Sequence, residues 1–165
     1  MNLSGSFQLP APPERVYQLL LDPAVLARSM PGCERLDSIG ENEYAMRMKM
    51  VLASVSGLFD GKVRIAEQDP PHAFRLIVEG TGKIGFMKGD GRLTVTPDGD
   101  GAAVAFHGDV QVGGTIANVG QRLIEMSAKM LIKRFFAGMA AEAAAAVAQS
   151  KQEGADRTLP ASGAN

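Results

Sequence analysis

The residue types that could do chemistry are few and scattered along this chain. Cys33 is the one cysteine in 165 residues, so it could act as a nucleophile or a ligand but could form no internal disulfide. The histidines, His72 and His107, form no dyad with Cys33 that the sequence supports, and no spacing typical of a metal site occurs. We therefore interpret Cys33 as a small buried thiol in a reducing compartment.

Three carboxylates have the residue type that acid–base catalysis needs: Asp60, Glu79 and Asp109. Alternation along the expected strands places each of them on the face opposite to the apolar one, which indicates solvated charges. The one polar group expected on the apolar face is the hydroxyl of Tyr44. A cyclase or hydrolase would have to depend on that group, and we expect that the chain is not an enzyme.

The run Gly80-Thr81-Gly82-Lys83-Ile84-Gly85 has the letters of a dinucleotide-binding fingerprint. That fingerprint works only where a helix N-terminus follows it, and the glycine-rich residues 86–91 cannot open a stable helix. We predict a glycine-rich hairpin instead. It is either a flexible flap with an apolar tip at the mouth of a pocket, or a plain long hairpin.

Methionines mark one face of the clearest strand. Met46, Met48 and Met50 alternate with charged residues, and methionine is flexible enough to line a cavity that adapts to its occupant. The same stripe also fits an ordinary core. The chain has only seven Phe, two Tyr and no Trp to fill a strongly curved sheet, which favours a cavity, and an apolar cavity binds apolar ligands.

Hydrophobic periodicity and turn residues define the elements that must position these groups. A strand is expected over residues 3–9, followed by two short helices that begin at Pro12-Pro13 and at Asp22-Pro23. Residues 33–112 have the pattern of an antiparallel meander, and residues 118–149 form a helix whose broad apolar arc must pack on the sheet. We predict one α+β domain over residues 1–149 and a disordered polar tail over residues 150–165.

The overall charge excludes partners that depend on a strong global field. Seventeen basic and eighteen acidic residues leave a formal net charge of −1, so nucleic acid is not an expected partner. No signal peptide is evident, and no apolar stretch reaches the ~20 residues that span a bilayer. We expect a cytoplasmic protein whose contact with the inner membrane is local and peripheral.

Several short motifs follow one another over residues 1–140. They are Met30-Pro31-Gly32-Cys33-Glu34, Gly57-Leu58-Phe59-Asp60-Gly61-Lys62-Val63, Asp69-Pro70-Pro71, Gly80-Thr81-Gly82, Gly85-Phe86-Met87-Lys88-Gly89 and Val112-Gly113-Gly114-Thr115-Ile116-Ala117. In this order and spacing the chain resembles the family of the carbon monoxide dehydrogenase G subunit. That family belongs to the START-like, or polyketide cyclase-like, SRPBCC superfamily.

The resemblance implies a helix-grip fold, a curved antiparallel sheet wrapped around a long C-terminal helix, with two short helices after the first strand. It also implies a non-catalytic accessory protein of a molybdenum hydroxylase, which binds a quinone or other lipid and no metal, and which links the enzyme to the membrane. A packed adaptor or assembly factor that docks on the oxidoreductase without a ligand is the alternative. The residues expected around the apolar pocket are Tyr44, Met46, Met48, Met50, Phe59, Val63, Phe74, Leu76, Phe86, Met87, Phe106, Leu123, Met126 and Met130.

Overall fold

The computed structural model describes the backbone of residues 1–163 and the side chains of residues 1–154. The elements follow one another as β1 (Asn2–Leu9), α1 (Pro13–Leu20), α2 (Pro23–Ser29), β2 (Cys33–Gly40), β3 (Glu43–Leu52), β4 (Val55–Asp69), β5 (Ala73–Gly82), β6 (Gly85–Asp98), β7 (Gly101–Gly113), η1 (Thr115–Val119) and α3 (Gln121–Gly163). The predicted strand, two short helices, meander and long helix are confirmed in this order.

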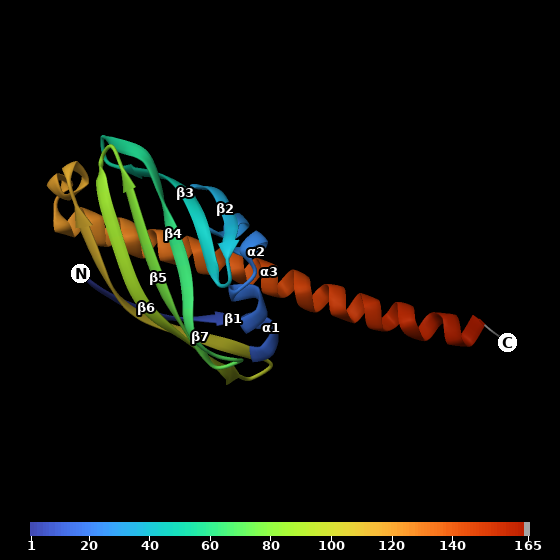
Figure 1. Ribbon diagram of the computed structural model, residues 1–165. Helices are drawn as coiled ribbons and strands as arrows, with labels where there is room; N and C mark the ends of the chain where they lie inside the picture. The colour runs from blue at the N-terminus through green and yellow to red at the C-terminus, as the bar shows by residue number, and fades with distance from the viewer. Residues whose placement is uncertain (164–165) are drawn as a thin grey trace.

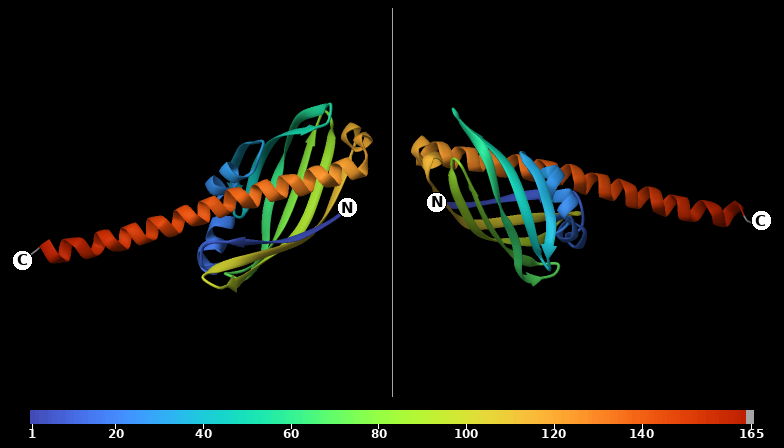
Figure 2. Two further views of the ribbon diagram at one scale, coloured as in Figure 1. Left: turned by 180° about the vertical axis from the view of Figure 1, so that it is seen from behind. Right: turned by 45° about the horizontal axis from the view of Figure 1, so that its top comes forward.

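The seven strands form one antiparallel sheet in the order β1-β7-β6-β5-β4-β3-β2. Figures 1 and 2 show the sheet curving around the first half of α3, with α1 and α2 beside one end of the sheet. Because β1 pairs with β7, the chain brings its first strand to the edge opposite β2. The predicted helix-grip architecture is therefore confirmed.

Local chemistry fixes the two short helices. The side chain of Asp22 accepts a hydrogen bond of 3.0 Å from the backbone N–H of Ala24, the expected N-cap of α2. Pro13 and Pro23 occupy first-turn positions, where a missing N–H costs no hydrogen bond. The buried hydroxyl of Tyr17 donates to the carbonyl oxygen of Ala73 at 3.0 Å and so ties α1 to the sheet. Burial, together with the nearby charge of Asp69, raises the pKa of this hydroxyl.

The glycine run forms a hairpin, as predicted. Strands β5 and β6 pair up to Gly82 and Gly85, and strand β6 follows directly where a dinucleotide site would need a helix. Gly85 has a φ of 139°, and a Cβ there would overlap the carbonyl oxygen of Gly113. The positive φ and the close approach of Gly113 explain why residue 85 is a glycine.

Helix α3 extends further than the sequence predicts. It begins at Gln121 and continues through Gly163, where a disordered tail is expected from Ser150; residues 164–165 of that tail lie outside the described residues. Lys151, Gln152 and Glu153 are exposed and have high helix propensity, which favours continuation of the helix past the predicted end. Figure 1 shows this end of α3 projecting well beyond the sheet.

Candidate functional site

A cavity of about 300 Å³ lies between the concave face of the sheet and α3. The strands contribute apolar side chains from all parts of the sheet, α1 and α2 close one end, and α3 covers the open face. The side chains that line it are Leu3, Leu20, Leu26, Met30, Cys33, Leu36, Met46, Met48, Met50, Val63, Phe74, Leu76, Val78, Met87, Leu93, Phe106, Val110, Leu131, Ile132, Phe135 and Phe136.

Packed side chains close the cavity on two sides. A larger buried cluster joins α1, α2 and α3 to the sheet and includes Phe74, Leu93 and Phe136. In it the ring of Phe136 stacks on that of Phe7, with 4.4 Å between centroids. A smaller cluster of Leu52, Phe59 and Ile116 fills the other end of the fold, beneath the β3–β4 and β5–β6 turns. The cavity is the space that neither cluster fills.

Three glycines on the concave face leave room for the cavity. Gly89 and Gly91 of β6 and Gly108 of β7 all line it, and Gly91 pairs directly with Gly108. Their neighbours in alternation, Leu93 and Phe106, also face inward, as strand geometry requires. A Cβ on Gly89 would meet only a methyl group of Val110, at 3.8 Å. The strand backbone therefore tolerates a side chain there, and the space is open because none is present.

Eight of the fourteen residues predicted around the pocket lie at the cavity. They are Met46, Met48, Met50, Val63, Phe74, Leu76, Met87 and Phe106. All eight come from the sheet, where strand alternation assigns the inner face correctly.

The other six predicted residues lie elsewhere. Phe59 is buried in the smaller cluster, and Leu123 packs against that cluster. Tyr44 packs against the larger cluster, and its hydroxyl does not line the cavity. Phe86 points to the outer face of the sheet. The remaining two, Met126 and Met130, belong to α3.

The placement of Met126 and Met130 is the clearest correction to the sequence-based pocket. Their side chains are 61% and 55% exposed, so both lie on the outer face of α3. The helix covers the cavity with Leu131, Ile132, Phe135 and Phe136 instead. Buried positions continue along this face at Met139, Ala143 and Ala146, at the spacing of one side of a helix.

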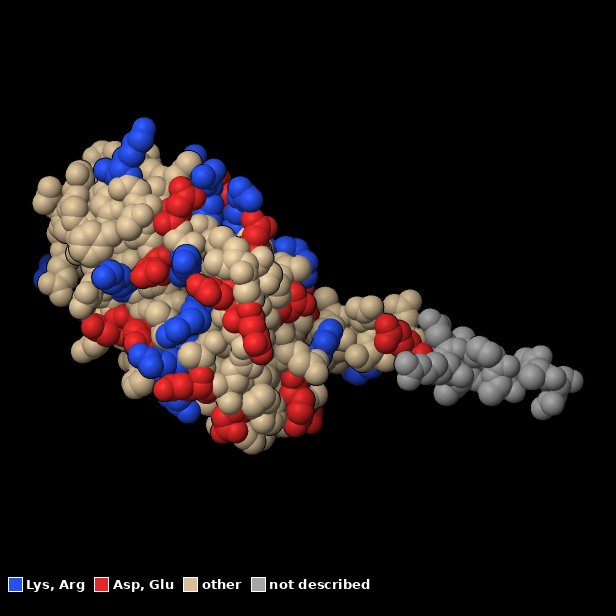
Figure 3. All heavy atoms as spheres, in the orientation of Figure 1, with Lys and Arg blue, Asp and Glu red and all other residues tan. Residues whose placement is uncertain are grey.

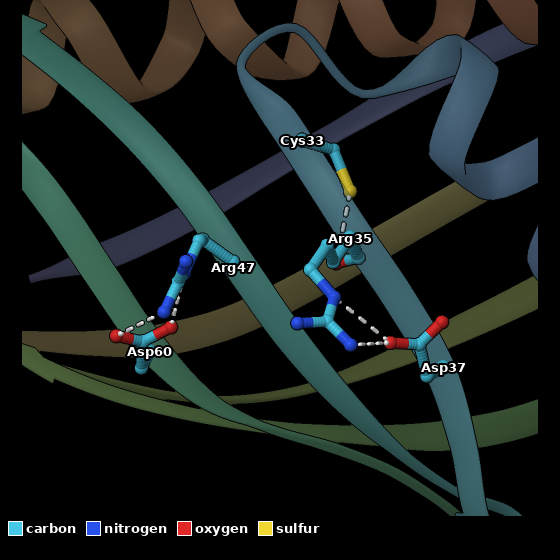
Figure 4. A network of polar contacts seen from close by, with 5 residues as sticks. All are labelled: Cys33, Arg35, Asp37, Arg47 and Asp60. Atoms are coloured by element: carbon cyan, nitrogen blue, oxygen red, sulfur yellow. Dashed lines mark hydrogen bonds and ion pairs between the residues drawn. The ribbon is translucent and has the colours of Figure 1, made fainter.

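Among the described residues that line the cavity, Cys33 is the one titratable residue whose side chain faces inward. The thiol donates to the carbonyl oxygen of Arg35 at 3.5 Å, as Figure 4 shows, and burial raises its pKa. The thiol is therefore protonated at neutral pH. This suits the predicted inert cysteine better than an activated nucleophile, which needs a lowered pKa.

Charged groups lie on the convex face of the sheet. Arg47 of β3 donates to Asp60 of β4, with 2.7 Å between Nε and Oδ1 (Figure 4). Arg75 pairs with Asp90 in the same way on β5 and β6. Each arginine lowers the pKa of its carboxylate partner. These pairs lie on the outer face of the sheet, while the side chains that line the cavity are apolar.

The family model of CoxG, the G subunit of carbon monoxide dehydrogenase, matches residues 5–144. The chain belongs to the CoxG family. Membership supports, in general terms, an accessory role beside carbon monoxide dehydrogenase, and it confirms the predicted family. No curated protein gives a significant match. None of the helices in the described part of the chain is long and apolar enough to cross a membrane.

Solved structures share the fold. A conserved protein from Geobacillus kaustophilus is 32% identical, with a TM-score of 0.83 over 87% of this chain and 95% of that one. A protein from Thermus thermophilus is 19% identical, with a TM-score of 0.69 over 88% and 99% of the two chains. The Zhui aromatase/cyclase from Streptomyces sp. R1128 is 15% identical, with a TM-score of 0.65 over 89% and 95%. The last two show the helix-grip fold alone.

Proposed function

We propose that this CoxG-family chain is a non-catalytic accessory protein that holds a quinone or a similar isoprenoid lipid for a molybdenum hydroxylase of the carbon monoxide dehydrogenase type. It links that enzyme to the membrane in which such lipids dissolve. The observation that carries the proposal is the apolar cavity of about 300 Å³ under α3.

The cavity wall supports an apolar occupant. Burying ~300 Å² of apolar ligand surface is worth roughly 7 kcal/mol at ~25 cal/mol per Å², before the cost of ordering the ligand. Without that cost, roughly 7 kcal/mol would correspond to a dissociation constant on the order of 10 μM, so micromolar affinity needs further contacts or a preformed cavity. Methionines 46, 48, 50 and 87 give the wall flexible side chains that can adapt to a ring or to a branched chain.

The polar groups near the cavity support a binding role over catalysis. Asp90, Arg92, His107 and Asp109 contribute backbone to the wall, but their side chains are exposed on the convex face. Cys33 is a protonated thiol at neutral pH. Acid–base or nucleophilic catalysis needs such groups within hydrogen-bond reach of the substrate. None of the four charged or imidazole side chains points at the space a ligand would fill, and Cys33, which does line that space, lacks the lowered pKa of an activated nucleophile.

The cavity also favours a ligand carrier over the packed adaptor. An adaptor needs only its surface, and its core would be filled to ordinary density. Here Gly89, Gly91 and Gly108 leave the concave face open at the level of Val78 and Val110. A space of this size in a core lowers stability unless an occupant restores the lost contacts.

Calorimetric titration with a short-tailed menaquinone tests the proposal. We expect one site per chain, a micromolar dissociation constant and a negative heat-capacity change from apolar burial. The chain has no tryptophan, so calorimetry is better suited than intrinsic fluorescence. Heats equal to those of dilution, in protein extracted free of lipid, would contradict a ligand role and favour the packed adaptor.

A further inference from the structure

The wall of the cavity offers a ligand almost no hydrogen-bonding group. Its inward-facing side chains are aliphatic, aromatic or thioether groups, and Cys33 is the exception among the described residues. The thiol of Cys33 already donates to the carbonyl oxygen of Arg35 at 3.5 Å, and sulfur is a weak acceptor. Figure 3 looks at the face of the sheet turned away from α3 and shows basic and acidic side chains interspersed across it. These charged side chains lie outside the cavity.

The other buried polar groups of the fold are occupied or remote from the cavity. Strands β5, β6 and β7 pair without a bulge, so their N–H and C=O groups hydrogen-bond to one another. The hydroxyl of Tyr17 donates to Ala73. In residues 1–154, Ser29 Oγ is the one fully buried side-chain oxygen or nitrogen without a partner, and Ser29 does not line the cavity. A ligand under α3 therefore meets no strong hydrogen-bond partner.

The same wall suits a flat aromatic ring. Phe74, Phe106, Phe135 and Phe136 line the cavity, and the rings of Phe135 and Phe136 meet edge to face with centroids 5.1 Å apart. A ligand ring can pack against such side chains by stacking or by edge-to-face contact. The sulfur atoms of the methionines in the wall also make favourable contacts with aromatic rings. A plain alkyl chain gains neither contact, so the wall favours the ring of a quinone over its tail.

We propose that the cavity binds the ring of a quinone in its oxidised form and discriminates against the quinol. This inference rests on the proposed function, since it concerns the ligand of the same cavity. A quinone carbonyl only accepts hydrogen bonds, whereas each of the two quinol hydroxyls also donates one and loses that bond on entry. An apolar pocket rejects an isostere with one added hydroxyl by about a hundredfold at most. We expect the quinol to bind at least tenfold more weakly than the quinone.

This preference makes the bound ligand harder to reduce than the free ligand. Binding and reduction are linked, so each tenfold preference for the quinone lowers the reduction potential of the bound two-electron couple by about 30 mV. Reduction of the ligand weakens its binding by the same factor. The protein thus takes up the oxidised ring and releases the reduced one, which gives a carrier a direction.

Val78 is the position at which one added hydroxyl should change this preference. It lines the cavity on β5 and lies directly opposite Gly89, whose missing side chain leaves Val78 open on that side. Val78→Thr keeps the shape of the side chain and adds a hydroxyl that can accept a hydrogen bond from the quinol. Val51→Thr makes the same change at a position that is 66% exposed and does not line the cavity, so it is the matched control.

Anaerobic calorimetry with three ligands tests the proposal. They are a short-tailed menaquinone, its quinol prepared with dithionite, and the dimethyl ether of that quinol, which keeps the ring but has no O–H group. We expect the wild type to bind the quinone and the ether with similar affinity and the quinol at least tenfold more weakly. Val78→Thr should narrow the ratio of quinone to quinol affinity several-fold, and Val51→Thr should leave it unchanged.

The outcomes separate this proposal from the ligand role itself. Equal affinity of the wild type for quinone and quinol would overturn the proposal and leave the ligand role intact. An ether that binds as weakly as the quinol would also overturn it, because the loss would then not come from the O–H groups. Both comparisons use the wild type, so they decide even where Val78→Thr fails to fold. If none of the three ligands binds, the ligand role is rejected, and this proposal with it.

Discussion

Gly91 of β6 and Gly108 of β7 lie directly opposite each other, and both face the cavity. Two adjacent strands therefore place no side chain into the concave side of the sheet at this level. The neighbouring pairs Leu93–Phe106 and Val95–Val104 fill the same face with large groups and belong to the packed core. The cavity is thus a consequence of which residues face inward on β6 and β7.

Filling this space should abolish ligand binding without unfolding the chain. In Gly89→Leu the new side chain enters the cavity, since a Cβ there meets only Val110 at 3.8 Å. We expect at least a tenfold loss of short-tailed menaquinone affinity by calorimetry and a free energy of unfolding within about 1 kcal/mol of the wild type. Gly154→Leu, at an open position on α3, is the matched control and should bind normally. Normal affinity in Gly89→Leu would place the ligand elsewhere.

Two methionine variants distinguish the inner face of the sheet from the outer face of α3. Met48 is buried at the cavity wall, whereas Met130 is exposed. Met48→Ala should lower the free energy of unfolding by about 2 kcal/mol and weaken ligand binding, while Met130→Ala should change neither. Chemical denaturation and calorimetry measure the two effects. An equal loss of affinity in both variants would mean that α3 presents a different face to the ligand.

The single thiol reports on occupancy of the cavity. Because burial raises the pKa of Cys33, alkylation by a neutral maleimide should be slow at pH 7 and should accelerate as the pH rises past the ordinary thiol pKa. Saturating ligand should slow the reaction further, since Cys33 lines the cavity. Mass spectrometry of the labelled protein gives the rate without ambiguity, because no second cysteine exists. Fast labelling, at a rate that the ligand does not change, would show that the thiol faces solvent.

A bidentate ion pair holds α2 against α3, and it should make stability depend on pH. Arg28 Nε and Nη2 lie 2.9 and 3.0 Å from the carboxylate oxygens of Glu142, and this contact lowers the pKa of Glu142. A lowered carboxyl pKa stabilises the fold above the ordinary range of that group, and this stabilisation is lost as the pH falls through the lowered value. Glu142→Gln should therefore melt at a lower temperature than the wild type at pH 7, and the gap should close in acid. A gap that persists after the pH has fallen through the lowered pKa of Glu142 would assign the effect to packing.

Strand alternation is sufficient to predict most of the sheet side of the cavity. Side chains alternate between the two faces of a strand, so one charged residue that must face solvent assigns its apolar neighbours to the inner face. The helix side is harder. Met126 and Met130 look like core residues in an apolar arc, yet the face that packs is the one with Phe136, Met139 and Ala143. Small alanines carry little hydrophobic signal, so the period of the buried face is masked.

The glycines illustrate a second limit. In a sequence, Gly89, Gly91 and Gly108 indicate bends or close contacts as readily as an open cavity, and only the register of β6 with β7 shows which of them face inward together.

Native mass spectrometry tests most directly whether the cavity holds an apolar lipid. Wild type and Gly89→Leu are purified side by side without detergent, incubated with short-tailed menaquinone, and weighed intact. We predict a near-stoichiometric adduct on the wild type and none on Gly89→Leu. An unmodified mass for both proteins, or the same adduct on both, would contradict a lipid site in this cavity.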